Sequence, residues 1–442
     1  MSGEAKIIEP SILAGFMELL PEDQMLFNRM MDTIKQTYES FGFIPLDTPV
    51  IEKSEVLLAK SGGETAKQVY RFNKGDNDLA LRFDLTVPLA RYVAQHYGEL
   101  TFPFRRYHIA KVYRGEKPQK GRFREFYQCD IDIIGNGSLN IINDAEIVSV
   151  IYSTFKALGF DDFTVMINNR KLLNGFFKSH NITDALEVLR VVDKIDKAGS
   201  DYVKEELSRM GIESNAVDAV MKLVSMSGSP LEIVEELKTL SIDDENFKTG
   251  LEELETVCNC IKALGVPEKN FSLNLKIARG LDYYTGTVYE TFLNDYPELG
   301  SVCSGGRYDE LASNYTKQSL PGVGISIGFS RLFYQLKAAG LIYSEKRSTP
   351  SKILLVPMDG TLEFTLATAS KLRESGINTE VYMNSGKMAK KFNYANKLGI
   401  PYVGVIGESE MAENAVMLKD MESGEQKLVP VANIASEINL SN

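Results

Sequence analysis

The segment FRRYHIAKVYRGEKPQKGRFREFYQCDIDII, residues 104–134, decides the fold predicted for this chain. Two strand-like runs, 104–114 and 122–134, flank the basic loop GEKPQKG, a pattern typical of a β-hairpin. Successive side chains of a strand point to opposite faces of the sheet. One face of the second run is apolar and predicts a core face, with Tyr127, Cys129, Ile131 and Ile133. The opposite face carries Arg124, Phe126, Gln128, Asp130 and Asp132.

This polar face of the hairpin is the first candidate binding surface. On the preceding strand, Arg106, His108 and Arg114 are in phase with one another. Such a face is either open to water or the floor of a charged pocket. The basic loop beside it favours a phosphate-bearing ligand, which Arg114 would meet as a planar, multidentate donor.

A second informative segment is RGLDYYTGTVYE, residues 279–290. It places a guanidinium, a carboxylate and two phenols on a loop before a strand, groups that suit a small, charged, hydrogen-bonding ligand. A polar turn in which Tyr283 and Tyr284 only pack is the alternative reading of this segment.

A third segment, PGVGISIGF at 321–329, alternates apolar residues with small ones. Glycines 322, 324 and 328 and Ser326 share one face, and such a face would let a flat ligand lie against the backbone. We expect Ser330 to cap a helix that begins with Arg331. A cation there opposes the helix dipole, so a bound anion would compensate; a surface arginine is the alternative.

Composition excludes several classes of protein. Among 442 residues there is no apolar run of the ~20 residues that a membrane helix needs, and the N-terminus does not read as a signal peptide. Four cysteines do not make a disulfide framework, and three scattered histidines argue against a zinc site. We therefore predict a cytoplasmic protein with no membrane association and no protein-held metal.

The net charge of −11 argues against general nucleic-acid binding, and we predict no DNA binding. Two local basic clusters, at 105–124 and 387–397, nevertheless favour a polyanion contacted at two places. A solvated face is the alternative for each cluster.

The organisation along the chain predicts an α+β protein. A helix at 21–42 precedes a strand that Pro45 and Pro49 confine to an edge, a plausible dimerisation element or a core helix beside an edge strand. Amphipathic helices follow one another at 181–268 and predict an all-helical insertion. We expect a discontinuous domain of residues 1–180 and 269–343 around this insertion, and an α/β domain at 350–442.

The chain has no Walker-type loop and no strand–GxGxxG–helix unit, so nucleotide binding would depend on arginines over an antiparallel sheet. This arrangement resembles class II aminoacyl-tRNA synthetases. The segment ending at Pro49 resembles their motif 1, YRGEKPQKGRFREFYQCDIDIIG motif 2 and GVGISIGFSRL motif 3. RGLDYYTGTVYE and CSGGRYD, residues 303–309, resemble the signature peptides of histidyl-tRNA synthetases, and the last segment resembles their anticodon-binding domain.

The resemblance implies a class II antiparallel-sheet catalytic domain with a helical insertion, a C-terminal α/β anticodon-binding domain and a homodimer. It implies ATP-dependent activation of L-histidine to histidyl-adenylate, with diphosphate released and Mg²⁺ carried with ATP, and transfer to the 3′ end of tRNA(His). The non-catalytic, synthetase-like regulatory subunit of ATP phosphoribosyltransferase is the alternative, and a tRNA-sensing module is a third. The intact arginines and the segment 350–442 favour the ligase.

The resemblance also assigns residues. Arg114 and Arg331 match the arginines that hold the α- and γ-phosphates of ATP, and Arg279 matches the family's own arginine at the α-phosphate. This makes Arg279 and Arg114 the expected catalytic residues. The expected ATP-binding residues are Arg114, Glu116, Arg122, Arg279 and Arg331. The expected histidine-binding residues are Asp84, Thr86, Gln128, Asp132, Arg279, Tyr283, Tyr284 and Tyr308.

Within that set, Asp84, Thr86 and Gln128 match positions at the α-amino group. Asp132 and Tyr284 match positions at the imidazole, with Tyr308 near the pocket wall. Many bacterial members have glutamate where this chain has Asp84 and Asp132, so each carboxylate here reaches one methylene less. A helix N-terminal acid is the alternative role for Asp84.

Overall fold

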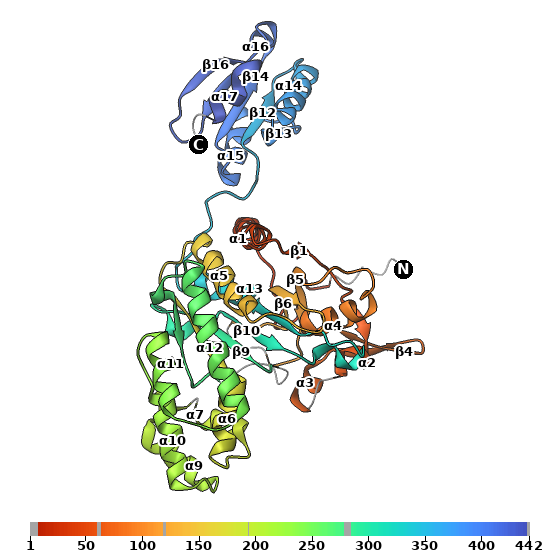
Figure 1. Cartoon of the computed structure of the whole chain (residues 1–442). Helices are drawn as coiled ribbons and strands as arrows, with labels where there is room; N and C mark the ends of the chain where they lie inside the picture. The colour runs from red at the N-terminus through yellow and green to blue at the C-terminus, as the bar shows by residue number, and fades with distance from the viewer. Residues whose placement is uncertain (1–7, 60–62, 118–120, 193, 278–283, 440–442) are drawn as a thin grey trace. The chain divides into compact units, whose positions relative to one another are not determined.

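The computed structural model describes residues 8–59, 63–117, 121–192, 194–277 and 284–439. Its centre is an eight-stranded sheet in the order β1-β5-β6-β11-β10-β9-β7-β8 (Figure 1). Five neighbouring pairs are antiparallel, while the outermost pairs, β1–β5 and β7–β8, are parallel. The strands are β1 (Ile44–Pro45), β5 (Phe104–Tyr113), β6 (Glu125–Ile134), β7 (Phe163–Asn169), β8 (Phe271–Leu273), β9 (Thr287–Leu293), β10 (Cys303–Tyr308) and β11 (Gly322–Ile327).

The predicted hairpin is the pair β5–β6, and its register places Arg106 opposite Asp132 and His108 opposite Asp130. The apolar face is core, because Cys129, Ile131 and Ile133 have no exposed surface. The polar face is buried as well: Arg106 is 0 % exposed, Asp130 2 % and Asp132 3 %. These three charged side chains therefore face the protein interior, whereas others of the hairpin, such as Arg122, are exposed.

The helix α1 (Pro21–Ser40) begins where the sequence predicts and ends two residues before the predicted end at 42, with Gly42 just beyond it at φ +77°. It contacts the back of the hairpin, since the Tyr38 hydroxyl donates to the carbonyl of Cys129 at 3.2 Å. The strand β1 that follows pairs along one side only and forms an edge of the sheet, as its prolines predict.

Further helices and a small sheet accompany the large sheet. The helices are α2 (Ser54–Leu58), α3 (Gly63–Gln68), α4 (Thr86–Gln95), α5 (Ile142–Ala157) and α13 (Phe329–Ala338). The small sheet has the order β2-β4-β3, from β2 (Ile51–Lys53), β3 (Arg71–Lys74) and β4 (Asn77–Leu81).

One predicted helix start is wrong. α13 begins at Phe329, with Gly328 as its N-cap residue, two residues before the predicted start at Arg331. Ser330 therefore lies inside the first turn and does not cap the helix. Its hydroxyl instead accepts from the backbone N–H of Tyr127 at 2.9 Å, which ties α13 to β6.

Helices occupy most of the chain between β7 and β8, in the region where the sequence predicts an insertion. They are α6 (Arg170–Ser179), α7 (Ala185–Val192), α8 (Ile195–Ala198), α9 (Ser200–Arg209), α10 (Ser214–Ser225), α11 (Pro230–Thr239) and α12 (Glu245–Ala263). A capping box between Ser229 and Glu232 begins α11. α12 packs on α5 and α6, and its Glu253 accepts a hydrogen bond from Asn169, the residue that also caps α6.

A second compact unit contains residues 342–442 together with 18–29. Its five-stranded sheet has the order β13-β12-β14-β15-β16, with β12 (Ile353–Pro357), β13 (Thr379–Val381), β14 (Tyr402–Ile406), β15 (Ala415–Asp420) and β16 (Gln426–Pro430). Its helices are α14 (Leu362–Glu374), α15 (Met388–Leu398), α16 (Glu408–Ala412) and α17 (Ile434–Asn439). In the described ranges, no helix is long and apolar enough to cross a membrane.

Candidate active site

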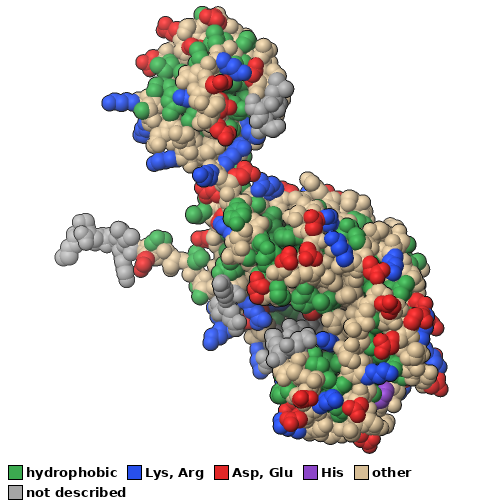
Figure 2. Space-filling view, turned by 90° about the vertical axis from the view of Figure 1, so that its left-hand side faces the viewer, with side chains coloured by type: hydrophobic (Ala, Val, Ile, Leu, Met, Phe, Trp, Pro, Cys, Tyr) green, Lys and Arg blue, Asp and Glu red, His purple; other side chains and the backbone are tan. Residues whose placement is uncertain are grey.

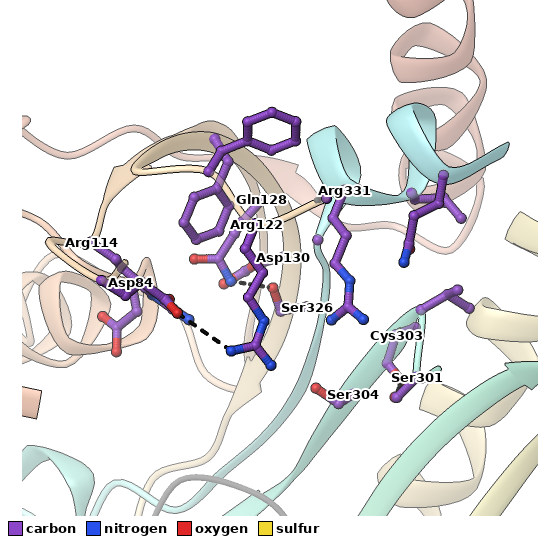
Figure 3. Close-up of a pocket in the computed structure, with 18 of the residues that line it drawn as sticks. Asp84, Arg114, Arg122, Gln128, Asp130, Ser301, Cys303, Ser304, Ser326 and Arg331 are labelled. Atoms are coloured by element: carbon purple, nitrogen blue, oxygen red, sulfur yellow. Dashed lines mark hydrogen bonds and ion pairs between the residues drawn. The ribbon is translucent and has the colours of Figure 1, made fainter. Parts of the chain in front are cut away.

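A pocket of about 450 Å³ lies over the polar face of the hairpin (Figure 3). It is formed by residues from β6, β10 and β11, the start of α13, the loop before α4 and the ends of the hairpin loop. Eight of the residues assigned from the sequence line this one pocket: Asp84, Thr86, Arg114, Glu116, Arg122, Gln128, Tyr284 and Arg331. Side chains that are up to 247 positions apart in the chain, from Asp84 to Arg331, thus meet in one cavity.

Three arginines give one part of the pocket a positive charge. The Nε of Arg114 donates to the carbonyl of Phe83 at 2.9 Å, and its guanidinium lies 5.2 Å from the centre of the Phe126 ring. These contacts orient the group while its terminal nitrogens stay available. Among the described residues no carboxylate lies within ion-pair distance of Arg114, so an anionic ligand would supply the missing counter-charge.

Arg122 and Arg331 reach into the same pocket, with their guanidinium groups side by side in Figure 3. Burial lowers the pKa of Arg331, and the charge of Arg122 lowers it further, whereas Glu116 raises it. Arg331 is held by the carbonyl of Leu299 at 3.1 Å, and Arg122 lies 3.7 Å from Glu116. Two neighbouring cations, of which one pairs with a carboxylate, suit a polyanion such as a triphosphate.

The floor of the pocket is acidic and buried. Asp84 accepts a hydrogen bond from the backbone N–H of Val87 at 3.0 Å, the N-terminal contact foreseen as its alternative role, and its Oδ2 has no partner among the described residues. Gln128 donates to Ser326 at 2.6 Å, and its Oε1 has no partner in the described part of the chain. Asp130 also lines the pocket, and within the same residues its Oδ1 is likewise unpaired.

Asp132 and Tyr308 lie behind this floor. Both oxygens of Asp132 are already engaged: Oδ1 accepts from the hydroxyl of Tyr308 at 2.6 Å, and Oδ2 lies 2.6 Å from Arg106. Neither Asp132 nor Tyr308 is among the residues that line the pocket. Burial raises the pKa of Asp132 to about 6, even though Arg106 and Tyr308 lower it.

The glycine face of β11 serves a different purpose from the predicted one. A Cβ at Gly324 would lie 2.2 Å from Asp132 Oδ1, and one at Gly322 would lie 2.5 Å from the Tyr308 ring. These two glycines therefore make room for the protein's own side chains. Only the end of the predicted face reaches the pocket, through Ser326 and Gly328.

Two of the assigned residues, Arg279 and Tyr283, lie outside the described residues. Among the described residues of the motif that contains them, Tyr284 lines the pocket.

The two basic clusters are not uniform surface patches. Arg106 is buried in the first cluster, where Arg105 pairs with Glu146 and Lys111 with Glu125. In the second, Lys391 is only 8 % exposed and donates to the carbonyl of Pro357, whereas lysines 387, 390 and 397 are exposed. On the face shown in Figure 2, basic and acidic side chains are interspersed.

Asp130 is the pocket residue that the sequence assignment missed. It is on the same strand face as Gln128 and Asp132, so the two-residue period already placed it beside them. Burial raises its pKa to about 7; Arg106 lowers the pKa, Asp132 raises it, Ser326 lowers it and Asp84 raises it. His108, which faces Asp130 from β5, adds no positive charge at neutral pH because burial and Arg106 lower its pKa to about 3.

This pKa predicts a pH-dependent gain in stability for Asp130→Asn. The folded-state pKa exceeds the unfolded value of about 3.9, so the stability contributed by the protonated carboxyl is fully present below pH ~4 and is lost as the pH rises to about 7. Because asparagine cannot ionise, the variant does not lose this stability as the pH rises. We expect the variant to match the unliganded wild type near pH 4 and to exceed it by roughly a few kcal/mol at pH 8.

Thermal or urea unfolding at pH 5 and pH 8 measures this difference. Asp76→Asn, at an exposed position in the β3–β4 turn, is the control and should show no pH-dependent gain. A change in stability of the same size at both pH values would contradict the prediction.

Comparisons with known proteins identify the family. The family model described as histidyl-tRNA synthetase matches residues 15–332, and an anticodon binding domain model matches residues 352–439. A curated protein named histidine–tRNA ligase from Clostridium tetani is 61% identical over 95% of this chain and 96% of its own length. Another of that name, from Finegoldia magna, is 49% identical over 98% of this chain and all of its own length.

Solved structures agree with these relatives. A crystal structure of histidyl-tRNA synthetase from Nostoc sp. PCC 7120 superposes with a TM-score of 0.91 at 41% identity and covers 99% of this chain and 100% of that one. A structure titled ATP phosphoribosyltransferase regulatory subunit/histidyl-tRNA synthetase, from Bacillus halodurans, gives 0.74 at 23% identity, covers 88% of this chain and 97% of that one, and shares the fold alone. The chain belongs to the histidyl-tRNA synthetase family of class II aminoacyl-tRNA synthetases.

Proposed function

We propose that this chain activates L-histidine with ATP in the pocket described above and transfers the histidyl group to tRNA(His) for protein biosynthesis. In the first step, a carboxylate oxygen of histidine attacks the α-phosphorus of ATP; the bond to the bridging oxygen breaks, and diphosphate leaves as histidyl-adenylate forms. In the second step, the 3′-terminal ribose hydroxyl of the tRNA attacks the histidyl carbonyl and AMP leaves. The observation that carries the proposal is a single pocket with arginines on one side and unpaired acidic acceptors on its floor.

The arginines would serve ATP. Arg114 is proposed at the α-phosphate and Arg331 at the γ-phosphate, with Arg122 and Glu116 beside them. Mg²⁺ would arrive with ATP as part of the substrate. Because no covalent enzyme intermediate is required, catalysis here would consist of positioning and of stabilising the negative charge that develops on the phosphate. Arg279 is proposed to act at the α-phosphate as a second catalytic residue.

The buried floor would serve histidine. Asp84, Thr86 and Gln128 are proposed at the α-amino group. Tyr284, Tyr283 and Asp132 are proposed at the imidazole, with Tyr308 beside them and Arg279 also near the substrate. Asp132 would act from behind the pocket floor, where Tyr308 and Arg106 hold it. A site that pairs both ring nitrogens would reject amino acids that lack them by ~10⁴–10⁵-fold, since its buried polar groups would otherwise stay unpaired.

The remaining proposals concern the whole protein. We infer a homodimer that forms through α1 and the edge strand β1, where Ile44 is 51% exposed, and a cytoplasmic location. We place the boundaries of the catalytic domain at 1–180 and 269–343, of the helical insertion at 181–268 and of the anticodon-binding domain at 350–442. The exposed lysines at 387, 390 and 397 and Lys117 of the hairpin loop are the proposed tRNA contacts.

Histidine-dependent exchange between ATP and labelled diphosphate tests the activity. We expect robust exchange with L-histidine and none with proline or glycine. Charging of tRNA(His) transcripts then tests the second step. Absence of any exchange in a folded, dimeric preparation would refute the proposal and favour a regulatory role.

A further inference from the structure

Among the described residues, three buried hydrogen-bond acceptors that lack a partner belong to side chains lining the pocket. They are Asp84 Oδ2, Gln128 Oε1 and Asp130 Oδ1, and each belongs to a residue at most 8 % exposed. An unpaired buried acceptor costs about 1–3 kcal/mol, so three of them around one cavity indicate a site for a ligand that donates. Among the described residues, the other unpaired buried polar atoms are on Arg91, Arg106, His108, Thr287 and Thr291, and none of these residues lines this pocket.

The charges of the pocket floor favour the same kind of ligand as the unpaired acceptors do. Asp84, Asp130 and Asp132 are all buried, and Arg106, which is also buried, contacts Asp132 at 2.6 Å. Of the three carboxylates that line the pocket, Glu116 lies 3.7 Å from Arg122, whereas neither Asp84 nor Asp130 has an ion pair among the described residues. A ligand that brings a positive charge and several N–H groups would satisfy both deficits.

An ammonium group meets this description better than an imidazole does. It has three N–H donors and no acceptor, so it can pair with all three oxygens. A neutral imidazole has one N–H donor and would leave at least two of the three unpaired. The number of unpaired acceptors therefore selects the amino group of the substrate and not its ring.

We propose that Asp130 is a substrate-positioning and specificity-determining residue that accepts a hydrogen bond from the α-ammonium group of histidine, together with Asp84 and Gln128. This inference depends on the proposed function. It adds a carboxylate that lines the pocket to the amino-acid site. Asp130 lies two residues before Asp132, whose Oδ1 already accepts a hydrogen bond from Tyr308. Asp130 is thus a binding residue for the amino group, separate from the recognition of the ring.

The test compares two ligands that differ at the ammonium. L-Histidinol keeps the α-ammonium and the imidazole, whereas 3-(imidazol-4-yl)propionate keeps the ring and lacks the amino group. Calorimetry of wild type and Asp130→Asn with each ligand separates the two contacts. We expect Asp130→Asn to weaken the binding of histidinol about ten-fold or more, since a charged carboxylate acceptor is replaced by a neutral amide, and not to weaken the binding of imidazolepropionate.

Kinetics supply a second readout. In the exchange assay, the KM for histidine should rise in Asp130→Asn by a similar factor while the KM for ATP stays within about two-fold of wild type. Thermal unfolding confirms that the variant is folded. If Asp130→Asn does not fold, Asp130→Ser removes the same charge and should show the same selective loss.

Two results would overturn the inference. Equal weakening of both ligands would assign Asp130 to the ring or to the fold, and unchanged histidinol binding would remove it from the site. These results are distinct from a failure of the proposed function, in which the wild type itself shows no histidine-dependent exchange.

Discussion

Arg114→Ala is expected to lower the rate of histidyl-adenylate formation by about 10²–10³-fold, the cost of removing one preorganised donor from a developing oxyanion. The side chain is oriented before any ligand binds, by its hydrogen bond to Phe83 and by the ring of Phe126. Its loss would leave charge at the α-phosphate without its planar donor. Stability should change little, because the residue gives up one hydrogen bond and no ion pair in the described part of the chain.

Single-turnover formation of histidyl-adenylate measures the effect. Lys111→Ala is the matched control: it removes a cation of the same hairpin that pairs with Glu125 at 2.7 Å and does not line the pocket. Arg114→Lys should recover only part of the rate, because an ammonium keeps the charge but not the fork of donors. A rate within a few-fold of wild type in Arg114→Ala would contradict the assignment.

Much of the fold could be predicted because local patterns specify it. The two-residue period of 122–134 assigned the core face of β6, and the sequence also located the helix α1. The start of α13 was missed because Phe329 continues the apolar alternation of β11 and reads as strand. Alternation alone does not show where the backbone turns from strand to helix.

The site was predicted less completely, because its final form depends on long-range contacts. The two-residue period of a strand places Asp130 and Asp132 on the same face of β6. The sequence does not show which of the two carboxylates keeps an unpaired oxygen. That is decided by Tyr308, which reaches Asp132 from β10 across β11. Tyr308 can reach Asp132 only because Gly322 and Gly324 have no side chains. From the sequence alone, these glycines were interpreted as making room for a ligand.

Long-range contacts also explain why the two basic clusters were interpreted as surface patches. Arg106 and Lys391 count as basic residues in the sequence, yet both are buried and serve the interior. Lys391 donates to the carbonyl of Pro357, and Arg106 contacts Asp132 and the carbonyl of Leu85. A count of charges along the chain does not separate these from the exposed lysines beside them.

Arg106→Met is expected to lower the free energy of unfolding by about 3–5 kcal/mol at pH 8, the range for a buried charge left without its partner. Arg106 has no exposed surface and is the buried cation that lowers the pKa of both Asp130 and Asp132. Without it, the two carboxylates would have to be protonated or remain charged in the interior. At pH 5 the loss should be smaller, because groups with pKa values of about 7 and about 6 are then largely neutral and need no cation.

Urea unfolding at the two pH values measures the loss, with Arg105→Met as the matched control. Arg105 is the neighbouring arginine on β5 and pairs with Glu146 at 2.8 Å, but both side chains are partly exposed. Its replacement should cost about 0–1 kcal/mol with little dependence on pH. Equal losses in the two variants, or a larger loss for Arg106→Met at pH 5 than at pH 8, would contradict the view that one buried arginine holds the acidic floor of the pocket together.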